Sequence, residues 1–275
     1  MPIPSSPFPL PSFPFPEALL PPAKQRILQA VSSQRELPDG RWLSLSFRLG
    51  ERGSPIPAIL QLPNGPERAP AALLLHGFSS RKEQMAGALG GALLAHGIAS
   101  LAIDLPLHGE RSDANVLRGQ IAPLTVLREW RAALADGGLA LRFLGAHPSV
   151  DRTRLAVAGY SLGAYLALAL AAGDAAPRAV VLAAGGDLPT DTPFTHLVRP
   201  LADPLAAVRR LAGRPLLMVH GRHDRTIRPE QAERLYAAAS EPKEIQWWDA
   251  GHYLPDAAID RAAAWLAGRL GLGAG

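Results

Sequence analysis

Residues 155–163 read LAVAGYSLG, and they are followed by an Ala- and Leu-rich segment that runs to Gly173. The apolar run Leu155–Ala158 predicts a buried strand, and Leu162–Gly173 predicts a helix. Ser161 is therefore expected at a sharp strand-to-helix turn, which holds it in an unfavourable backbone conformation with its Oγ projecting. Its neighbours must be small because side chains there would meet the adjacent backbone, and the helix N-terminus adds partial positive charge. This stretch predicts a serine nucleophile.

The rest of the chain alternates between short apolar runs and helical stretches. The runs are continuous, as is typical of parallel strands buried on both faces. They are Ala71–Leu75, Ile98–Ile103, Ala179–Ala184, Leu216–Val219 and, more weakly, Ile245–Trp248. The helical stretches are Gln84–His96, Thr125–Ala146, Pro204–Leu211, Pro229–Ala239 and Pro255–Leu270. This alternation predicts an α/β fold, a mostly parallel twisted sheet of about eight strands with helices on both faces.

The N-terminal segment has a different composition. Proline recurs throughout residues 1–22, which excludes a helix or a central strand there because each proline removes an N–H donor. We expect this arm, which also carries Phe8, Phe13 and Phe15, to pack on its own domain or to be flexible. The apolar spacing that follows predicts a short helix over Ala23–Arg35.

After a Pro-Asp-Gly turn signal, the period changes to that of strands. Trp42–Leu49 and Ile56–Leu62 predict two antiparallel edge strands joined near residues 50–55. We therefore expect an N-terminal arm and short helix over residues 1–37, and one catalytic domain over residues 38–275.

Composition excludes several classes of protein. The 275 residues include no cysteine, which excludes disulfides, thiolate nucleophiles and Cys-type zinc sites. Mean hydropathy of +0.06 is too high for a disordered chain, and no apolar run reaches the roughly 18 residues of a membrane-spanning helix. The net charge is +4, but no basic tract with interleaved aromatics accompanies it. We expect no nucleic-acid or membrane partner and, since residues 1–22 do not resemble a signal peptide, a cytoplasmic location.

A serine nucleophile needs a general base and a carboxylate that orients the base. In this architecture they follow the serine in the order acid, then histidine, on loops after later strands. One predicted strand leads into a turn that carries Asp224, and the next leads into a loop that carries His252. Both lie at the carboxyl ends of strands, where α/β sheets place ligands. We predict Ser161, Asp224 and His252 as the catalytic triad.

Other polar residues near these strand ends are alternatives. Asp187 is a second candidate for the orienting acid. His220, His223 and Asp224 together could indicate a metal site, but no further cluster has ligand-like spacing, so we expect no metal and no cofactor. Taken singly, His223 is interpreted as a surface turn residue, and Asp249 as a surface or loop-fixing group.

The tetrahedral intermediate of acyl transfer needs hydrogen-bond donors aimed at its oxyanion. The predicted donors are the backbone N–H groups of Phe78, which follows the strand Ala71–Leu75, and of Leu162, which follows the nucleophile. We expect His76 and Asp104 to brace loops by hydrogen bonds rather than to take part in the chemistry.

Together these motifs resemble the α/β-hydrolase superfamily over residues 38–270. The motifs are Leu75–Phe78, Asp104–Gly109, Gly159–Gly163, His220–Asp224 and Gly251–His252. Within the superfamily, the chain resembles the bacterial serine esterases grouped near dienelactone hydrolases and the prolyl-oligopeptidase catalytic domain. It departs from dienelactone hydrolases, which use a cysteine nucleophile, and from prolyl oligopeptidases, which carry a large N-terminal propeller. The resemblance implies the α/β-hydrolase fold and serine esterase chemistry.

Two connections are long enough to cover such a site, Leu105–Leu124 and Gly185–Asp203. The second is apolar and proline-rich, which predicts a small cap over residues 185–203. Its apolar residues either line an acyl or aryl site over the serine or seal the cap onto the core. We expect a serine carboxylesterase that acts on a small-molecule ester of short to medium acyl chain through an acyl-enzyme intermediate. The alternatives are an aminopeptidase or amidase with the same triad, and a non-catalytic binding protein of this fold.

Overall fold

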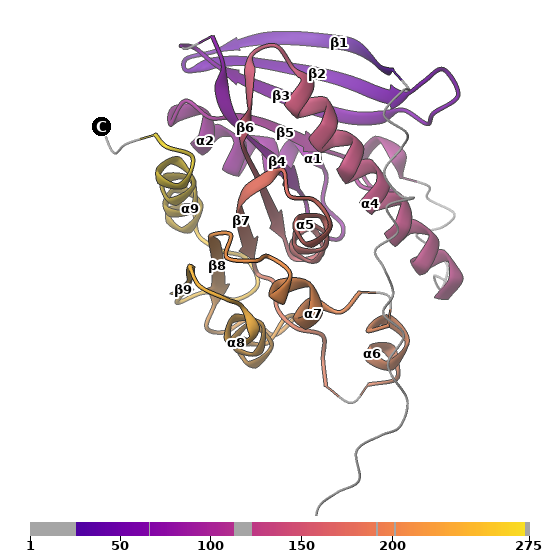
Figure 1. Cartoon of the computed structure of the whole chain (residues 1–275), viewed down its shortest axis with the longest axis vertical. Helices are drawn as coiled ribbons and strands as arrows, with labels where there is room; N and C mark the ends of the chain where they lie inside the picture. Colours follow the sequence, from indigo (N-terminus) through magenta and orange to yellow (C-terminus); the bar gives the residue numbers. More distant parts are fainter. Residues whose placement is uncertain (1–25, 66, 113–122, 191, 201, 273–275) are drawn as a thin grey trace, which may run out of the picture.

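The computed structural model describes residues 26–272 except residues 66, 113–122, 191 and 201. A nine-stranded sheet forms its centre, in the order β1-β2-β3-β5-β4-β6-β7-β8-β9 (Figure 1). The strands are β1 Ile27–Leu37, β2 Gly40–Leu49, β3 Ile56–Pro63, β4 Ala69–Leu75, β5 Ala99–Ile103, β6 Val150–Tyr160, β7 Pro177–Ala183, β8 Leu216–Gly221 and β9 Lys243–Trp248. In this spatial order, the pairs from β1 through β2 and β3 to β5 are antiparallel. The pairs from β5 through β4, β6, β7 and β8 to β9 are parallel, so the predicted mostly parallel sheet is confirmed.

Helices cover both faces of the sheet, as predicted (Figure 1). The helical elements are α1 Lys82–Met85, the π-helical turn η2 Ala86–Gly90, α2 Gly91–Ala95, the 3-10 turn η3 Gly109–Arg111, α4 Pro123–Ala146, α5 Leu162–Gly173, α6 Pro193–Val198, α7 Pro204–Arg209, α8 Pro229–Ala238 and α9 Asp256–Arg269. One apolar core lies between the sheet and α4, α5, α7 and α8. A second core lies between the sheet and η2, α2 and α9.

Strand β6 shows how the sequence divides its side chains between these cores. Successive side chains of a strand point to opposite faces of the sheet. Leu155 and Val157 therefore lie in the core on the α5 face, whereas Ala156 and Ala158 lie in the core on the α9 face. All four are buried, which explains why the strand reads as a continuous apolar run.

The N-terminal part of the sheet differs from the prediction. The predicted helix over Ala23–Arg35 is wrong, because from Ile27 onward the chain forms strand β1, which pairs with β2. The register shifts between Val31 and Ser33, as it does at a β-bulge. The extra residue breaks the two-residue alternation, so the apolar residues resemble a helical pattern although they lie on a strand.

Strand β1 also corrects two related expectations. The predicted strands Trp42–Leu49 and Ile56–Leu62 are confirmed as β2 and β3, but the edge of the sheet is β1, not β2. The division after residue 37 falls at the end of β1, so the strand before it belongs to the same sheet as the catalytic domain. The predicted arm over residues 1–22 lies outside the described residues.

The predicted cap contains one short helix, α6. Figure 1 shows α6 beside α7 and on the opposite side of the molecule from α9. Asp187, at the start of this segment, accepts hydrogen bonds from Arg199 Nη2 at 2.9 Å and from Arg234 Nε at 3.1 Å. The bond from Arg234 ties the segment to α8, and the bond from Arg199 lies within the segment. Much of the other predicted covering connection, residues 113–122, lies outside the described residues.

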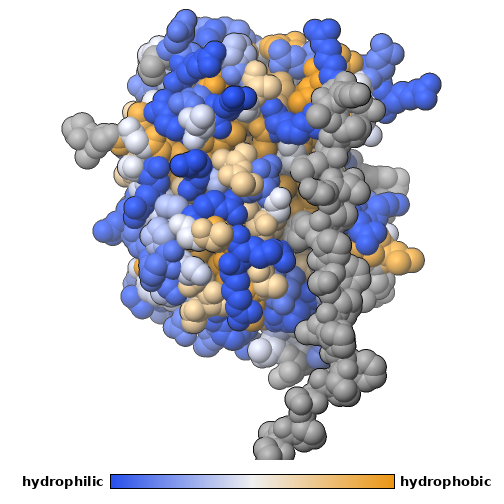
Figure 2. Space-filling model, in the orientation of Figure 1, coloured by the Kyte–Doolittle hydropathy of each residue, from blue (hydrophilic) through white to orange (hydrophobic). Residues whose placement is uncertain are grey.

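The face of the molecule seen in Figure 2 is largely polar. Figure 2 shows hydrophilic residues spread over the visible face, with small apolar areas between them. None of the described helices is long and apolar enough to cross a membrane.

Candidate active site

Ser161 occupies the turn between β6 and α5. Its backbone angles, φ 52° and ψ −113°, lie where a side chain is strained, which costs on the order of 1–3 kcal/mol. The turn is tight enough that a Cβ on Gly159 would lie 2.0 Å from the carbonyl oxygen of Gly163. Gly159 therefore allows β6 and the first turn of α5 to touch, and Gly163 allows that turn to approach the end of β4, since a Cβ there would lie 2.1 Å from the carbonyl oxygen of Leu75.

The structure brings the three predicted triad residues together. The hydroxyl of Ser161 lies 3.0 Å from His252 Nε2, and His252 Nδ1 lies 2.8 Å from Asp224 Oδ2. Asp224 is buried, and the side chain of His252 is 17% exposed. In the tautomer with a proton on Nδ1, His252 donates to the carboxylate and accepts from the serine hydroxyl. This arrangement can take a proton from Ser161 and stabilise the imidazolium that forms.

Backbone hydrogen bonds fix the aspartate. Asp224 Oδ1 accepts from the backbone N–H groups of Thr226 at 2.8 Å and Ile227 at 3.0 Å, which leaves Oδ2 for His252. The loop that carries Asp224 is joined to the loop that carries His252, since His223 N–H donates to the carbonyl of Ala250 at 2.9 Å. The acid and the base are therefore held on two connected loops.

Tyr160 has a structural role that the sequence did not predict. Its hydroxyl donates a hydrogen bond to the backbone carbonyl of His252, and burial raises the pKa of this phenol to about 12, so it stays a donor at neutral pH. The residue before the nucleophile thus anchors the loop that carries the base. Strand alternation predicts only that the side chain of residue 160 faces α9, as that of Ala158 does, and not which group it meets there.

The alternative residues lie elsewhere or point away. The carboxylate of Asp187 is occupied by Arg199 and Arg234 and is not hydrogen-bonded to His252. His223 Nε2 lies 2.7 Å from Asp249 Oδ1 on the exposed surface, so His223 does not converge with His220 and Asp224.

His220 lies next to the triad without joining it. Its Nε2 is 2.9 Å from the carbonyl of Ile227 and 3.7 Å from Asp224 Oδ2. Burial lowers the pKa of His220, so the ring is neutral at pH 7 and supports the Asp224 loop through the Ile227 carbonyl.

The loop after β4 passes directly beside the nucleophile. A Cβ on Gly77 would lie 3.3 Å from the Cβ of Ser161, so the residue before Phe78 lies against the nucleophile. His76 braces this loop, because its Nε2 accepts from the N–H of Leu105 at 3.1 Å and its Nδ1 lies 2.8 Å from the carbonyl of Gly77. Burial lowers the pKa of His76 to about 4, so the ring is neutral.

A buried ion pair lies at the end of the loop that follows β4. Lys82 Nζ lies 2.9 Å from Asp104 Oδ2 and 2.6 Å from Glu110 Oε1, and both Lys82 and Asp104 are buried. Asp104 also accepts from the backbone N–H groups of Lys82 and Glu110. The network joins the start of α1 to the end of β5.

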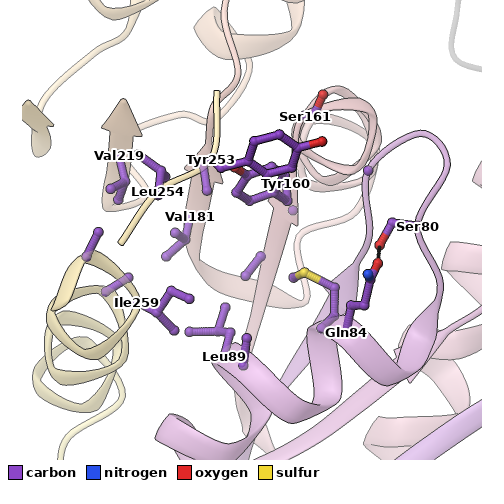
Figure 3. A pocket seen from close by; sticks show the side chains of 18 of the residues that line it. Ser80, Gln84, Leu89, Tyr160, Ser161, Val181, Val219, Tyr253, Leu254 and Ile259 are labelled. Carbon is purple, nitrogen blue, oxygen red and sulfur yellow. Dashed lines mark hydrogen bonds between the residues drawn. The ribbon is translucent and has the colours of Figure 1, made fainter. Parts of the chain in front are cut away.

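An apolar cavity of about 370 Å³ opens beside Ser161 and His252. Figure 3 shows Val181, Val219, Leu254, Ile259 and Leu89 around it, with Ser161, Tyr160 and Tyr253 along one side. Its walls come from the sheet, from α9 and from α1 and η2. The described lining contains no residue of the predicted cap, and the cavity lies on the α9 face of the sheet. Of the two roles open to the cap's apolar residues, this favours sealing the cap onto the core.

The sheet, its flanking helices and this site have the arrangement of the α/β-hydrolase fold. Residues 151–263 match the model of a serine hydrolase family (FSH1). The predicted fold is confirmed, and the matched segment, which is less than half of the chain, is similar to serine hydrolases.

Individual proteins are similar to this chain in sequence or in fold. The polyketide transferase ATR5 of Stachybotrys chlorohalonatus is 33% identical over 153 residues, which are 54% of this chain and 48% of that protein. The chain thus spans about half the length of this curated relative. Acetyl xylan esterase 1 of Thermoanaerobacterium sp. JW/SL YS485 has the same fold, with a TM-score of 0.71, 21% identity, and coverage of 89% of this chain and 88% of that one. A cold-adapted esterase from an Arctic intertidal metagenomic library has a TM-score of 0.67, 20% identity, and coverage of 86% and 97%.

Proposed function

We propose that this chain hydrolyses carboxylic esters of short to medium acyl chain through an acyl-enzyme formed on Ser161. The observation that carries the proposal is the hydrogen-bonded line from Asp224 through His252 to Ser161, which ends at the mouth of an apolar cavity. The match to a serine hydrolase family and the esterases among proteins of the same fold support this reaction.

The acylation step follows from the geometry. As Ser161 Oγ attacks the ester carbonyl carbon, its proton passes to His252 Nε2, and Asp224 stabilises the imidazolium through Nδ1–H. The N–H groups of Phe78 and Leu162 donate to the oxyanion of the tetrahedral intermediate. Its collapse breaks the ester C–O bond, and His252 returns the proton to the departing alcohol.

Deacylation uses the same groups with water in place of the serine. His252 takes a proton from a water molecule, the water oxygen attacks the acyl carbon, and the bond to Ser161 Oγ breaks. Ser161 recovers its proton from His252, and the carboxylic acid leaves. No group beyond the triad and the oxyanion donors is required.

Replacing Ser161 with alanine tests the proposal. We expect Ser161→Ala to abolish p-nitrophenyl acetate hydrolysis and labelling by a fluorophosphonate, since both need Oγ. Ser149, in the loop before β6, provides the control variant Ser149→Ala, which should retain both activities. Undiminished turnover in Ser161→Ala would end the proposal.

Matched substrates separate esterase from amidase activity. We expect a p-nitrophenyl ester to be cleaved faster than the p-nitroanilide of the same acid. A faster reaction on the anilide would establish the aminopeptidase or amidase reading instead, and absence of fluorophosphonate labelling would favour a non-catalytic binding protein.

A further inference from the structure

The cavity beside Ser161 exists because small side chains face each other across the second core. On β6 and β7, the side chains toward α5 are large, as in Leu155 and Leu182, whereas those toward α9 include Ala158 and Ala183. Helix α9 faces them with two further alanines, Ala258 and Ala262. Short side chains on both sides of a helix-sheet contact leave space, which protein interiors otherwise fill.

The cavity runs down from the carboxyl end of the sheet. Tyr160, Ala183 and Val219 are paired across β6, β7 and β8 and form an upper row, and Ala158 and Val181 form a lower row two residues earlier. Helix α9 begins just after His252 and lines the cavity with Ala258 and, one turn later, Ala262. The strand residues and the α9 residues line the cavity over the same depth, so the cavity is a slot with the sheet on one side and α9 on the other (Figure 3).

The lining determines what chemistry the slot accepts. Its lower walls are buried aliphatic side chains, and no Asp, Glu, Lys or Arg lies among the described lining residues. The rim instead carries two exposed aromatics, Phe78 and Tyr253, which are 60% and 86% exposed. The lining also includes Ser80 and Gln84, whose side chains are hydrogen-bonded to each other. An uncharged hydrocarbon chain gains from burial against the aliphatic walls, whereas a charged group would lose its hydration without finding an opposite charge.

We propose that this slot is the acyl site of the enzyme and takes an unbranched saturated chain of medium length. The proposal rests on the ester hydrolysis proposed above. An apolar slot that begins beside Ser161 suits the group that stays covalently attached to Ser161 through both steps. The alcohol has to depart, and water has to enter, before deacylation. The alcohol part of the ester is therefore placed at the exposed rim near Tyr253, and the acyl part in the slot.

The two rows of side chains set the length of the chain. One two-residue step along a strand is about 6.6 Å, and Ala258 to Ala262 along α9 covers about 6 Å. With carbon–carbon bonds of about 1.5 Å in a zigzag, roughly five carbons beyond the carbonyl reach the lower row. The preferred acyl groups are therefore hexanoyl to octanoyl, longer than acetyl.

Two substrate series test the assignment. With p-nitrophenyl esters from acetate to dodecanoate, we expect kcat/KM to rise by up to roughly fourfold per methylene up to hexanoate or octanoate and then to fall. With acetate esters of alcohols of increasing length, we expect little change. The reverse pattern, or no dependence on acyl length, overturns the acyl site but leaves ester hydrolysis standing. Absence of hydrolysis of every ester overturns both proposals.

A variant at the bottom of the slot gives the sharper test. Ala262→Leu fills the lower part of existing space, so we expect the ratio of kcat/KM on octanoate to that on acetate to fall at least tenfold and the optimum to move to a shorter chain. Ala264→Leu makes the same change on the exposed side of α9 and should leave this ratio as it is. Equal ratios in the two variants, with both proteins folded by circular dichroism, refute the proposal.

Discussion

Substituting Gly159 by alanine tests whether contact between β6 and α5 sets the position of the nucleophile. A Cβ at residue 159 would lie 2.0 Å from the carbonyl oxygen of Gly163 and 2.6 Å from the amide nitrogen of Ala164. Both atoms belong to the backbone of the first turn of α5, so no side chain can rotate away. Helix and strand have to separate instead.

The size of the effect follows from those distances. Ordinary contact begins at 3.4 Å, so α5 has to move by roughly 1 Å or more in a close-packed interior. Overpacking that side chains absorb costs about 1–3 kcal/mol, and a clash between backbones reaches the upper end of that range or exceeds it. Since a displacement of about 1 Å at a reacting group can cost about 10²-fold in rate, we expect Gly159→Ala to lose at least that much kcat/KM.

Urea unfolding and p-nitrophenyl ester hydrolysis measure the two effects. Gly268→Ala is the matched control: this glycine lies in α9, where an added Cβ meets no atom within 4 Å. That change should stabilise the protein by about 0.5–1 kcal/mol, because alanine is the better helix residue, and should leave turnover intact. A Gly159→Ala protein with normal stability and activity within tenfold of the parent would refute the reasoning.

Three further predictions concern the acid, the neutral histidine and the buried ion pair. Asp224→Asn should lower kcat by about 10³–10⁴-fold because His252 loses the partner that fixes its tautomer, whereas Asp187→Asn should leave kcat within threefold; steady-state kinetics on one ester compares them. His76 has a pKa of about 4 in the folded protein against 6.5 when exposed, so the unfolded chain takes up the proton first as pH falls. The free energy of unfolding should then fall by up to about 3 kcal/mol between pH 6.5 and 4, with a smaller slope in His76→Gln. Lys82→Met leaves the buried carboxylate without its cation and should cost about 3–5 kcal/mol in urea unfolding; a loss below 1 kcal/mol would show that backbone donors alone satisfy the carboxylate.

The parts of this molecule that local sequence determines were predictable. The elbow around Ser161 needs only a strand, two small residues and a helix, all within residues 155–173. The positions of Asp224 and His252 follow because parallel strands bring their carboxyl ends to one edge of a sheet, so chain order alone indicates which loops meet. The fold class and the juxtaposition of these side chains could therefore be read before any coordinate was known.

Other parts depend on packing that local patterns do not report. Strand β1 lies at the edge with most of its side chains exposed, and its bulge near Val31 disrupts the alternation that marks a strand. Tyr160 bonds to a carbonyl 92 residues later in the chain, a contact that no spacing rule contains. The position of the cavity was not predictable for a similar reason, because apolar residues near a site indicate burial without indicating against what they are buried.

The acyl slot shows how alternation along a strand can carry more than fold information. In the run Leu155–Ala158 the large side chains all face α5 and the alanines all face α9, so one face of the strand is close-packed and the other leaves room. A run of the same hydrophobicity with large residues at every position would give the same fold, the same elbow and the same triad, but its second core would be filled. Ester hydrolysis would then depend on the triad alone, and acyl-chain selectivity would be lost. The residues that place Ser161 and those that shape its substrate site therefore alternate along one strand, and size must be considered separately for each face.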